Sequence, residues 1–287
     1  MMPFVPLEIK AFDKVAKFAL DLDQERPGEK NIHEWIASGK LYEPDVSFVL
    51  LRVLNAGDSV ADVGGHVGYF TLLSTALVGP TGQVLTFEPN PENYKRLKAN
   101  IEGNKFHHIT TINRPVTADG SSMTFYTNQD NDGGHALWNP GLHHGNPISR
   151  EHTVEETLET VTLDNAFAEF GASQSPKLIK IDTEGAELMV LEGARNLLGP
   201  EGTPFVVTEL NNFGLEQLGS SRQALREMMF EMGYETFLLP FSGNLPKLVP
   251  RTVDIRSSYI LNLLFSSTER VAEYWPTIDI EHPGDIT

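Results

Sequence analysis

Val60-Ala61-Asp62-Val63-Gly64-Gly65-His66-Val67-Gly68-Tyr69-Phe70 is the stretch that decides the fold of this 287-residue chain. A short apolar strand ends at the carboxylate of Asp62, turns through three glycines and opens into an apolar helix. Glycines let the backbone approach a ligand, and amide N–H groups face that ligand from the start of the helix. The stretch therefore predicts a strand–turn–helix nucleotide site that includes Asp62, Gly64, Gly65, His66 and Gly68.

A second acidic residue indicates that the nucleotide has a free ribose. The apolar run Val84 to Phe87 ends in Glu88, twenty residues after Gly68. A carboxylate at this strand end can accept hydrogen bonds from both ribose hydroxyls. We therefore predict that Glu88, with the adjacent Pro89 and Asn90, contacts the ligand.

The glycine spacing excludes the commonest nucleotides. In the dinucleotide pattern Gly-x-Gly-x-x-Gly, counted from Gly64, His66 and Tyr69 would occupy the second and third glycine positions, and no Walker lysine follows. The carboxylate of Asp62 would repel a pyrophosphate but attract an ammonium or sulfonium group. A ligand with a ribose and a cationic amino-acid tail, but no phosphate, is S-adenosylmethionine, which we predict as the cofactor.

Three segments together resemble the FkbM-type methyltransferases: Asp62 to Phe70, Phe87 to Asn93 and Lys180 to Glu187. The resemblance implies a Rossmann-like class I α/β fold, with a seven-stranded, mostly parallel sheet, helices on both faces and an antiparallel last strand. It also implies S-adenosylmethionine-dependent methylation, mostly of hydroxyl oxygens on sugars and natural products. This chain has Gly65-His66 where the family usually has Ala-Asn.

Composition limits the partners. The net charge of −17 argues against nucleic acid or an anionic membrane, because both need a basic surface. The chain has no cysteine, which excludes disulfides and thiol nucleophiles. No apolar run approaches the roughly 18 residues of a membrane span, and the first ten residues lack the features of a signal peptide. We expect a cytoplasmic protein of unknown oligomeric state.

The chain divides into an N-terminal helical extension, 1–42, and a methyltransferase domain, 43–287. The helical prediction for the extension rests on the spacing of Leu7, Phe12, Val15, Phe18 and Ala19. The domain contains an acceptor-side insertion at about 120–160. Its loop-like part, 128–156, has glycines, prolines, Trp138 and four histidines. We predict that this part forms an acceptor-binding lid in which Trp138 stacks on the acceptor.

Two contacts stay open at this point. Glu43 either touches the cofactor or, as we favour, caps the helix that follows it. The adenine lies beside Asn113 and Arg114 or beside the stretch 117–119, and the sequence does not choose between them.

A hydroxyl acceptor must lose its proton, which requires a base or a metal. Asp182, at the end of a buried strand next to the cofactor turn, is our first candidate, although it also suits the methionine amino group or a helix cap. His66, His135 and His152 are alternative bases, and we count His135 with Asp182 as catalytic. We expect no metal.

Two alternative functions remain. One is a magnesium- or calcium-assisted O-methyltransferase that uses Asp182, Glu209 and Asn211 as oxygen ligands. The other is a protein that binds S-adenosylmethionine without catalysis. The sequence does not identify the small-molecule hydroxyl acceptor.

Overall fold

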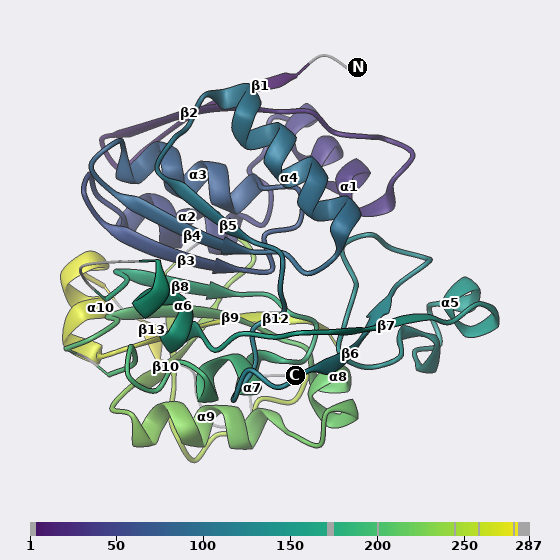
Figure 1. Ribbon diagram of the computed structural model, residues 1–287. Helices are drawn as coiled ribbons and strands as arrows, with labels where there is room; N and C mark the ends of the chain where they lie inside the picture. Colours follow the sequence, from purple (N-terminus) through teal and green to yellow (C-terminus); the bar gives the residue numbers. More distant parts are fainter. Residues whose placement is uncertain are drawn as a thin grey trace.

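The computed structural model describes residues 4–170, 175–199, 201–243, 245–257, 259–277 and 279–280. Within them, nine strands form a central sheet in the order β13-β11-β10-β12-β9-β8-β3-β4-β5 (Figure 1). These strands are β3 Ser59–Val63, β4 Gln83–Phe87, β5 Ile109–Ile112, β8 Leu178–Ile181, β9 Phe205–Leu210, β10 Glu235–Leu239, β11 Lys247–Val249, β12 Leu261–Ser266 and β13 Asp279–Ile280.

The five strands β9, β8, β3, β4 and β5 run parallel, and β12 is antiparallel to both β9 and β10. The α/β class and the antiparallel late strand are therefore confirmed. The number of strands differs from the expected seven, because the short strands β11 and β13 extend the sheet beyond β10. The core order places β3 at the centre, where the strand order reverses between β4 and β8.

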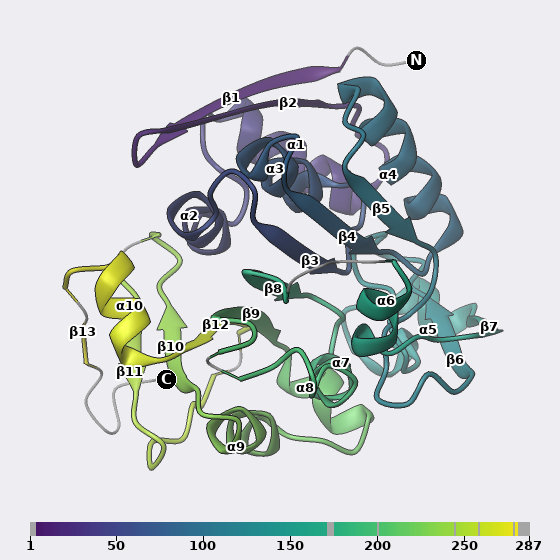
Figure 2. The ribbon, with the colours of Figure 1, turned by 60° about the vertical axis from the view of Figure 1, so that its left-hand side comes forward.

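Helices cover both faces of the sheet (Figure 2). One face carries α2 Pro44–Val53, α3 Tyr69–Val78, α4 Pro91–Asn104 and α10 Thr268–Tyr274, and the other carries α6 Leu163–Glu169, α7 Glu187–Glu192 and α9 Arg222–Glu231. The short helix α8, Asn212–Gln217, follows β9. No helix in the described part of the chain is long and apolar enough to cross a membrane.

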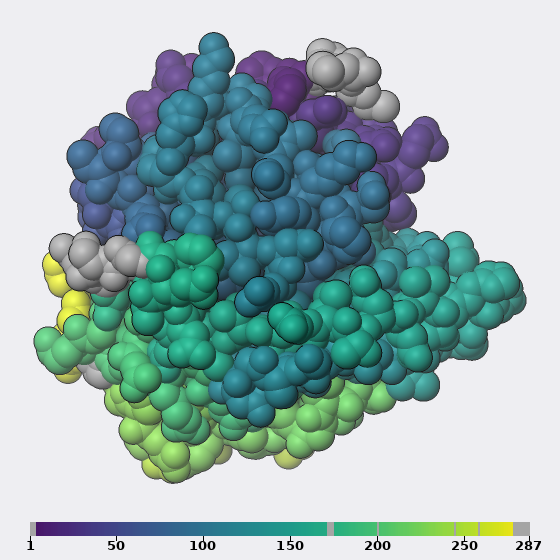
Figure 3. Space-filling view, in the orientation of Figure 1, coloured from purple at the N-terminus to yellow at the C-terminus, as the bar shows by residue number. Residues whose placement is uncertain are grey.

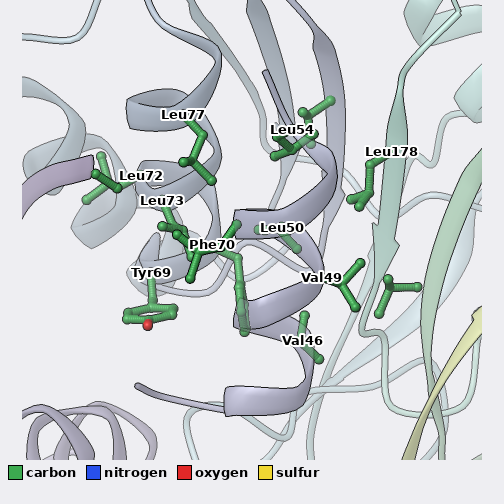
Figure 4. Packing of buried hydrophobic residues seen from close by; sticks show 14 of the residues in the cluster. Val46, Val49, Leu50, Leu54, Tyr69, Phe70, Leu72, Leu73, Leu77 and Leu178 are labelled. Carbon is green, nitrogen blue, oxygen red and sulfur yellow. The ribbon is translucent and has the colours of Figure 1, made fainter. Parts of the chain in front are cut away.

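Successive residues of the central strands enter two different cores, because side chains alternate across a strand. Val60 and Leu178 pack with α2 and α3 on one face, whereas Ala61 and Ile179 pack with α6 and α7 on the other. Figure 4 shows the first of these cores, with Phe70 and Leu73 of α3 lying beside Leu50 of α2. Burial on both faces explains why these strands are continuous apolar runs in the sequence.

The N-terminal segment contradicts the predicted helix. β1, Val5–Ala11, and β2, Lys14–Leu20, form an antiparallel hairpin that turns at Phe12 and Asp13, both with positive φ. The buried residues alternate (Ala16, Phe18, Leu20), whereas Phe12 and Val15 of the supposed helical stripe are 40% and 51% exposed. A period of two, rather than of 3.6, therefore governs this segment. Helix α1, Pro27–Ala37, follows, and the division after residue 42 stays a prediction.

The insertion is more regular than the predicted loop. β6, Met123–Thr127, pairs antiparallel with β7, Val154–Leu158. Between them lie a 3₁₀ turn, Pro140–Leu142, and the short helix α5, Pro147–Glu151. Together they form an arm that projects from the carboxyl edge of the parallel strands (Figures 1 and 3).

Candidate functional site

A cavity of about 290 Å³ opens at the carboxyl ends of β3, β4, β8 and β9, close to the lower limit of typical small-molecule sites. The predicted site residues that line this cavity are Glu43, Gly64, Gly65, His66, Glu88, Pro89, His135 and Asp182. They come from the α2 entry, the β3 and β4 turns, the insertion and the end of β8. The topology thus brings together most of the residues that the sequence singled out.

Three other predicted cofactor residues lie behind the cavity wall. The side chain of Asp62 is buried, accepts a hydrogen bond from the Thr71 hydroxyl (2.6 Å) and lies 3.7 Å from Nζ of Lys180. Asn90 caps α4 by accepting the N–H groups of Glu92 and Asn93. Gly68, with φ of 101°, is the N-cap residue of α3. These residues build the turns that carry the site rather than its surface.

Close contact with the backbone of Asp182 requires glycine at position 64 of the turn. Gly64 has a φ of 87°, and a Cβ there would lie 1.9 Å from the carbonyl oxygen of Asp182. The N–H groups of Gly64 and Gly65 both donate to the carbonyl of Phe87, and that of His66 donates to Glu88. The amides of the turn are therefore bonded within the protein, and the expectation that amides at the start of the helix face the ligand stays a prediction. The turn sets the spacing between the ends of β3, β4 and β8.

Glu88 is held at the cavity wall by the backbone. Oε2 accepts the N–H of His66 at 2.8 Å, and Oε1 accepts the N–H of Asn90 at 2.9 Å. Burial raises the pKa of Glu88 to about 7, despite the opposing charge of His66. Each oxygen has a second lone pair for a further donor. A pair of neighbouring hydroxyls, as in a ribose, fits this arrangement.

The structure separates the two candidate regions for the adenine. Arg114, Pro115 and Val116 line the cavity next to Pro89. Asn113 instead donates its amide to the carbonyls of Glu88 (2.7 Å) and Pro89 (3.0 Å). Thr117 is buried and bonds to Thr160 away from the cavity. Of the alternatives, the Asn113–Arg114 region is the one that reaches the cavity.

Carboxyl groups crowd the other end of the cavity around one lysine. Glu43, Asp182, Glu184 and Glu209 all line it, and Nζ of Lys180 lies 3.1 Å from Oδ2 of Asp182. Burial, and secondarily the charge of Asp182, raises the pKa of Glu43 to about 7. Glu43 makes no side-chain cap bond to the following helix with any described residue. Glu43 thus occupies the N-cap position of α2, where its backbone carbonyl accepts the N–H of Ser47, while its carboxyl makes no cap bond and stays available to the cavity.

Glu209 and Glu184 form a second acidic pair. Burial raises the pKa of Glu184 to about 8 and that of Glu209 well above its usual range, and their mutual repulsion adds to the increase at Glu209. Asn211 donates its amide to Oε2 of Glu184 at 2.7 Å. Oε2 of Glu209 is buried and has no hydrogen-bond partner among the described residues. A carboxyl whose pKa lies near or above neutrality is suited to proton transfer.

One oxygen of the predicted metal alternative already accepts a hydrogen bond. Oδ1 of Asn211 accepts the N–H of Gly214 at 3.0 Å, so this oxygen caps α8. In the part of the chain that the structure describes, no three His, Cys, Asp or Glu side chains are placed to hold a metal ion.

His135 lies in a different electrostatic environment from Asp182. Its Nδ1 accepts the N–H of Asn128 at 2.9 Å. Burial, followed by the charge of His66, lowers the pKa of His135 to about 4. The ring is therefore neutral at pH 7 with its proton on Nε2, and its one lone pair is already used. In this state His135 can donate a hydrogen bond into the cavity but cannot accept a proton.

The insertion places its tryptophan inside the protein. Trp138 is only 8% exposed, donates Nε1–H to the carbonyl of Glu184 at 2.6 Å and packs edge-on against Phe213. The expectation that its face stacks on an acceptor is wrong. Of the four histidines in the insertion, His135 is the one on the wall of the cavity. Trp138 instead anchors the arm to the β8–α7 turn.

Sequence reasoning missed Lys180 and Asp132. Lys180 stands inside a quoted motif, and its alternation with Asp182 along the strand could have placed both on one side. Asp132 lies in a loop without a recognisable motif, so only the structure identifies it.

The chain is similar in sequence to known methyltransferases. The family model described as the methyltransferase FkbM domain matches residues 62–236, which is more than half of the chain. The hexuronic acid methyltransferase AglP of Haloferax volcanii is 26% identical over 170 residues, covering 59% of this chain and 62% of the relative. Methyltransferase 1 of Beauveria bassiana is 26% identical over 180 residues, covering 56% of this chain and 66% of the relative.

The matched regions thus cover less than two thirds of either relative's length. Among solved structures, an S-adenosylmethionine-dependent O-methyltransferase from Thermotoga maritima aligns with 91% of this chain and 77% of its own, at 12% identity and a TM-score of 0.43. A score below 0.5 does not establish a common fold, so the fold assignment rests on the strand order of the chain itself.

Proposed function

The chain belongs to the FkbM methyltransferase family, and from this premise we propose that it transfers a methyl group from S-adenosylmethionine to a hydroxyl oxygen of a sugar or similar natural product. S-adenosylmethionine is the cofactor of this family and of this chain. The observation that carries the proposal is the cavity at the carboxyl ends of β3, β4, β8 and β9, which is lined by Glu88 from β4 and by a group of carboxyls around the end of β8.

The residues present fit this cofactor. Glu88 would accept the two ribose hydroxyls, and the apolar surfaces of Pro115 and Val116, which line the cavity beside Arg114, would hold the adenine. Glu43 and Asp182 attract the ammonium group of the methionine part. When bound, S-adenosylmethionine supplies an electrophilic methyl group. The residues of the chain bring the acceptor close to it and accept the proton of the acceptor.

We retain Asp182 as the first candidate for accepting that proton. It lines the cavity, and its ion pair with Lys180 keeps it oriented at the end of β8. Glu209 is the rival, because it lies one strand away and has an unpartnered oxygen. His135, with its lone pair used, takes the role of a hydrogen-bond donor to the ligand. No metal is required for either carboxylate to act as base.

The acceptor is proposed from two observations. The relative from Haloferax volcanii bears the name of a hexuronic acid methyltransferase, which favours a sugar. The net charge of −17 and the acidic cavity disfavour nucleic acid. We propose a small-molecule acceptor that carries a free hydroxyl, and we retain the prediction of a cytoplasmic location.

The experiment is methyl transfer from S-adenosylmethionine, radiolabelled in the methyl group, to a panel of neutral sugars, hexuronic acids and amino sugars. O-methyl ethers survive mild alkali, whereas methyl esters release labelled methanol, so alkali treatment separates a hydroxyl acceptor from a carboxylate acceptor. The proposal predicts an alkali-stable product whose formation EDTA does not reduce. Loss of activity in EDTA with recovery in magnesium would support the metal-assisted alternative. Cofactor binding with no transfer to any hydroxyl compound would favour a non-catalytic protein.

A further inference from the structure

Asp132 joins three parts of the chain that lie far apart in sequence. Its carboxylate accepts the N–H of Gly28 at 2.7 Å and contacts Nε2 of His66 at 2.9 Å. Its backbone carbonyl accepts the side-chain amide of Asn93 at 2.7 Å. The guanidinium of Arg26 lies 3.6 Å from the same carboxylate. Asp132, Gly28, His66 and Asn93 are called the Asp132 clamp below.

The clamp supplies the cap that helix α1 lacks. Arg26 occupies the N-cap position of α1 and makes no side-chain cap bond, whereas Asp132, 104 positions further along the chain, accepts the N–H of Gly28 in the first turn. A carboxylate at this end of a helix is favoured by the helix dipole. Burial alone would raise the pKa of Asp132, but the hydrogen bond and charge of His66 lower it to about 2, so the cap is ionised.

The junction between α1 and the insertion is also closely packed at Gly28. A Cβ on Gly28 would lie about 3.0–3.1 Å from Gly133 N, from the Asp132 carboxylate and from Cε1 of His66. Figure 1 shows α1 and the base of the insertion next to each other above the edge of the sheet, and the space-filling view shows their surfaces in contact (Figure 3).

Both partners of this junction form the wall of the cavity. Pro27, Gly28 and Asn31 line it from α1, and Asn131, Asp132 and Gly133 line it from the insertion. His66, on the cofactor turn, lies between them. Neither α1 nor the insertion belongs to the parallel sheet. They complete the wall of the cavity on the side of Glu88, because Glu88 accepts the N–H of the same His66 that Asp132 holds.

We propose that Asp132 is a positioning residue that fastens the insertion to α1 and to the cofactor turn, so that the cavity wall beside Glu88 retains bound S-adenosylmethionine. The inference rests on the proposed function, since it requires the cofactor to bind in this cavity. Loss of the Asp132 carboxylate removes the cap of α1, releases His66 and loosens the base of the insertion against α1. The bound cofactor then escapes faster, while the Glu88 contacts that recognise it stay in place.

The test measures dissociation of radiolabelled S-adenosylmethionine from the full-length protein, chased with excess unlabelled cofactor and followed by rapid filtration. No acceptor is needed. Asp132→Ala should increase the dissociation rate about ten- to hundredfold and change the association rate by less than about threefold. Gly28→Ala disturbs the same junction from the side of α1 and should act in the same direction.

Asp130→Ala is the matched control. Asp130 is two residues away and accepts the N–H groups of Ile148 and Ser149 within the arm, and it does not line the cavity. Its loss loosens the arm without touching α1, so the dissociation rate should stay within about twofold of wild type. Thermal melting of each variant separates the clamp from a structural role, which would lower the melting temperature but leave dissociation unchanged.

Two results overturn the inference in distinguishable ways. If the wild-type protein binds the cofactor but the folded Asp132→Ala and Gly28→Ala variants release it at the wild-type rate, the role proposed for the clamp is wrong and the proposed function stands. If wild type does not bind S-adenosylmethionine at all, both are wrong. Should Asp132→Ala not fold, Gly28→Ala alone decides between these outcomes.

Discussion

Replacing Glu88 by glutamine tests the centre of the cofactor site. The carboxylate accepts one backbone N–H on each oxygen, from His66 and from Asn90, and we assign its remaining lone pairs to the two ribose hydroxyls. Glutamine keeps the volume but has one acceptor oxygen, so its NH₂ group must face one of these backbone donors. The exchange removes a charged acceptor from the ribose, which should cost about 1.5–3 kcal/mol of binding free energy, or roughly ten- to hundredfold in affinity.

Calorimetric titration with S-adenosylhomocysteine at pH 8 measures this loss, because Glu88, with a pKa of about 7, is then ionised. Wild-type affinity should fall as the pH is lowered from 8 to 6, since protonation removes the acceptor, and the Glu88→Gln variant should lack this component of the pH dependence. Glu92→Gln, on the exposed first turn of α4, is the control and should bind as wild type does. An affinity within twofold of wild type in a folded Glu88→Gln variant would refute the assignment.

Three further predictions follow from the same geometry. Asp182→Asn should reduce methyl transfer at least a hundredfold, measured by radiolabel incorporation, and should lower cofactor affinity far less, because Glu43 still attracts the ammonium group. A larger loss of transfer in Glu209→Gln than in Asp182→Asn would reassign the base. Trp138→Phe leaves the Glu184 carbonyl without its donor, so the free energy of unfolding in urea should fall by about 1–3 kcal/mol, and an unchanged midpoint would contradict the anchoring role. The folded pKa of Glu88, about 7, lies above its usual 4.5, so its contribution to stability is complete below pH 4.5 and is lost as the pH rises through 7. Glu88 should therefore lower the melting temperature of the ligand-free protein between pH 5 and pH 8, and the Glu88→Gln variant should melt with a shallower pH dependence.

Much of the site followed from local sequence. The run from Val60 to Phe70 forms the predicted strand, turn and start of a helix. Its apolar residues, its glycines and the apolar residues that follow each indicate one of these elements within a few positions. Glu88 and Asp182 were found because the carboxyl ends of parallel strands meet at one edge of a sheet. These arguments need only the order of the elements along the chain. These predictions therefore do not require knowledge of the tertiary packing.

Local patterns gave wrong predictions where contacts between distant segments determine the structure. The apolar residues between Val5 and Leu20 fit a helical spacing, yet the segment forms a hairpin because alternate side chains of β2 pack against α3 and α4. Trp138 has the chemistry of a stacking surface, but the fold buries its ring against Phe213.

The sequence by itself determined the parallel core of the sheet, the glycine turn and the acids at the strand ends, since these depend on short-range periodicity. Only the tertiary structure decided which acids reach the cavity. Asp62 and Asp182 both stand at strand ends, yet the first is buried against Thr71 and the second faces the cavity. Likewise, no local pattern connects Asp132 to Gly28 or to His66, which lie 104 and 66 positions away. A helix cap supplied by a distant residue depends on how two segments outside the sheet pack against each other.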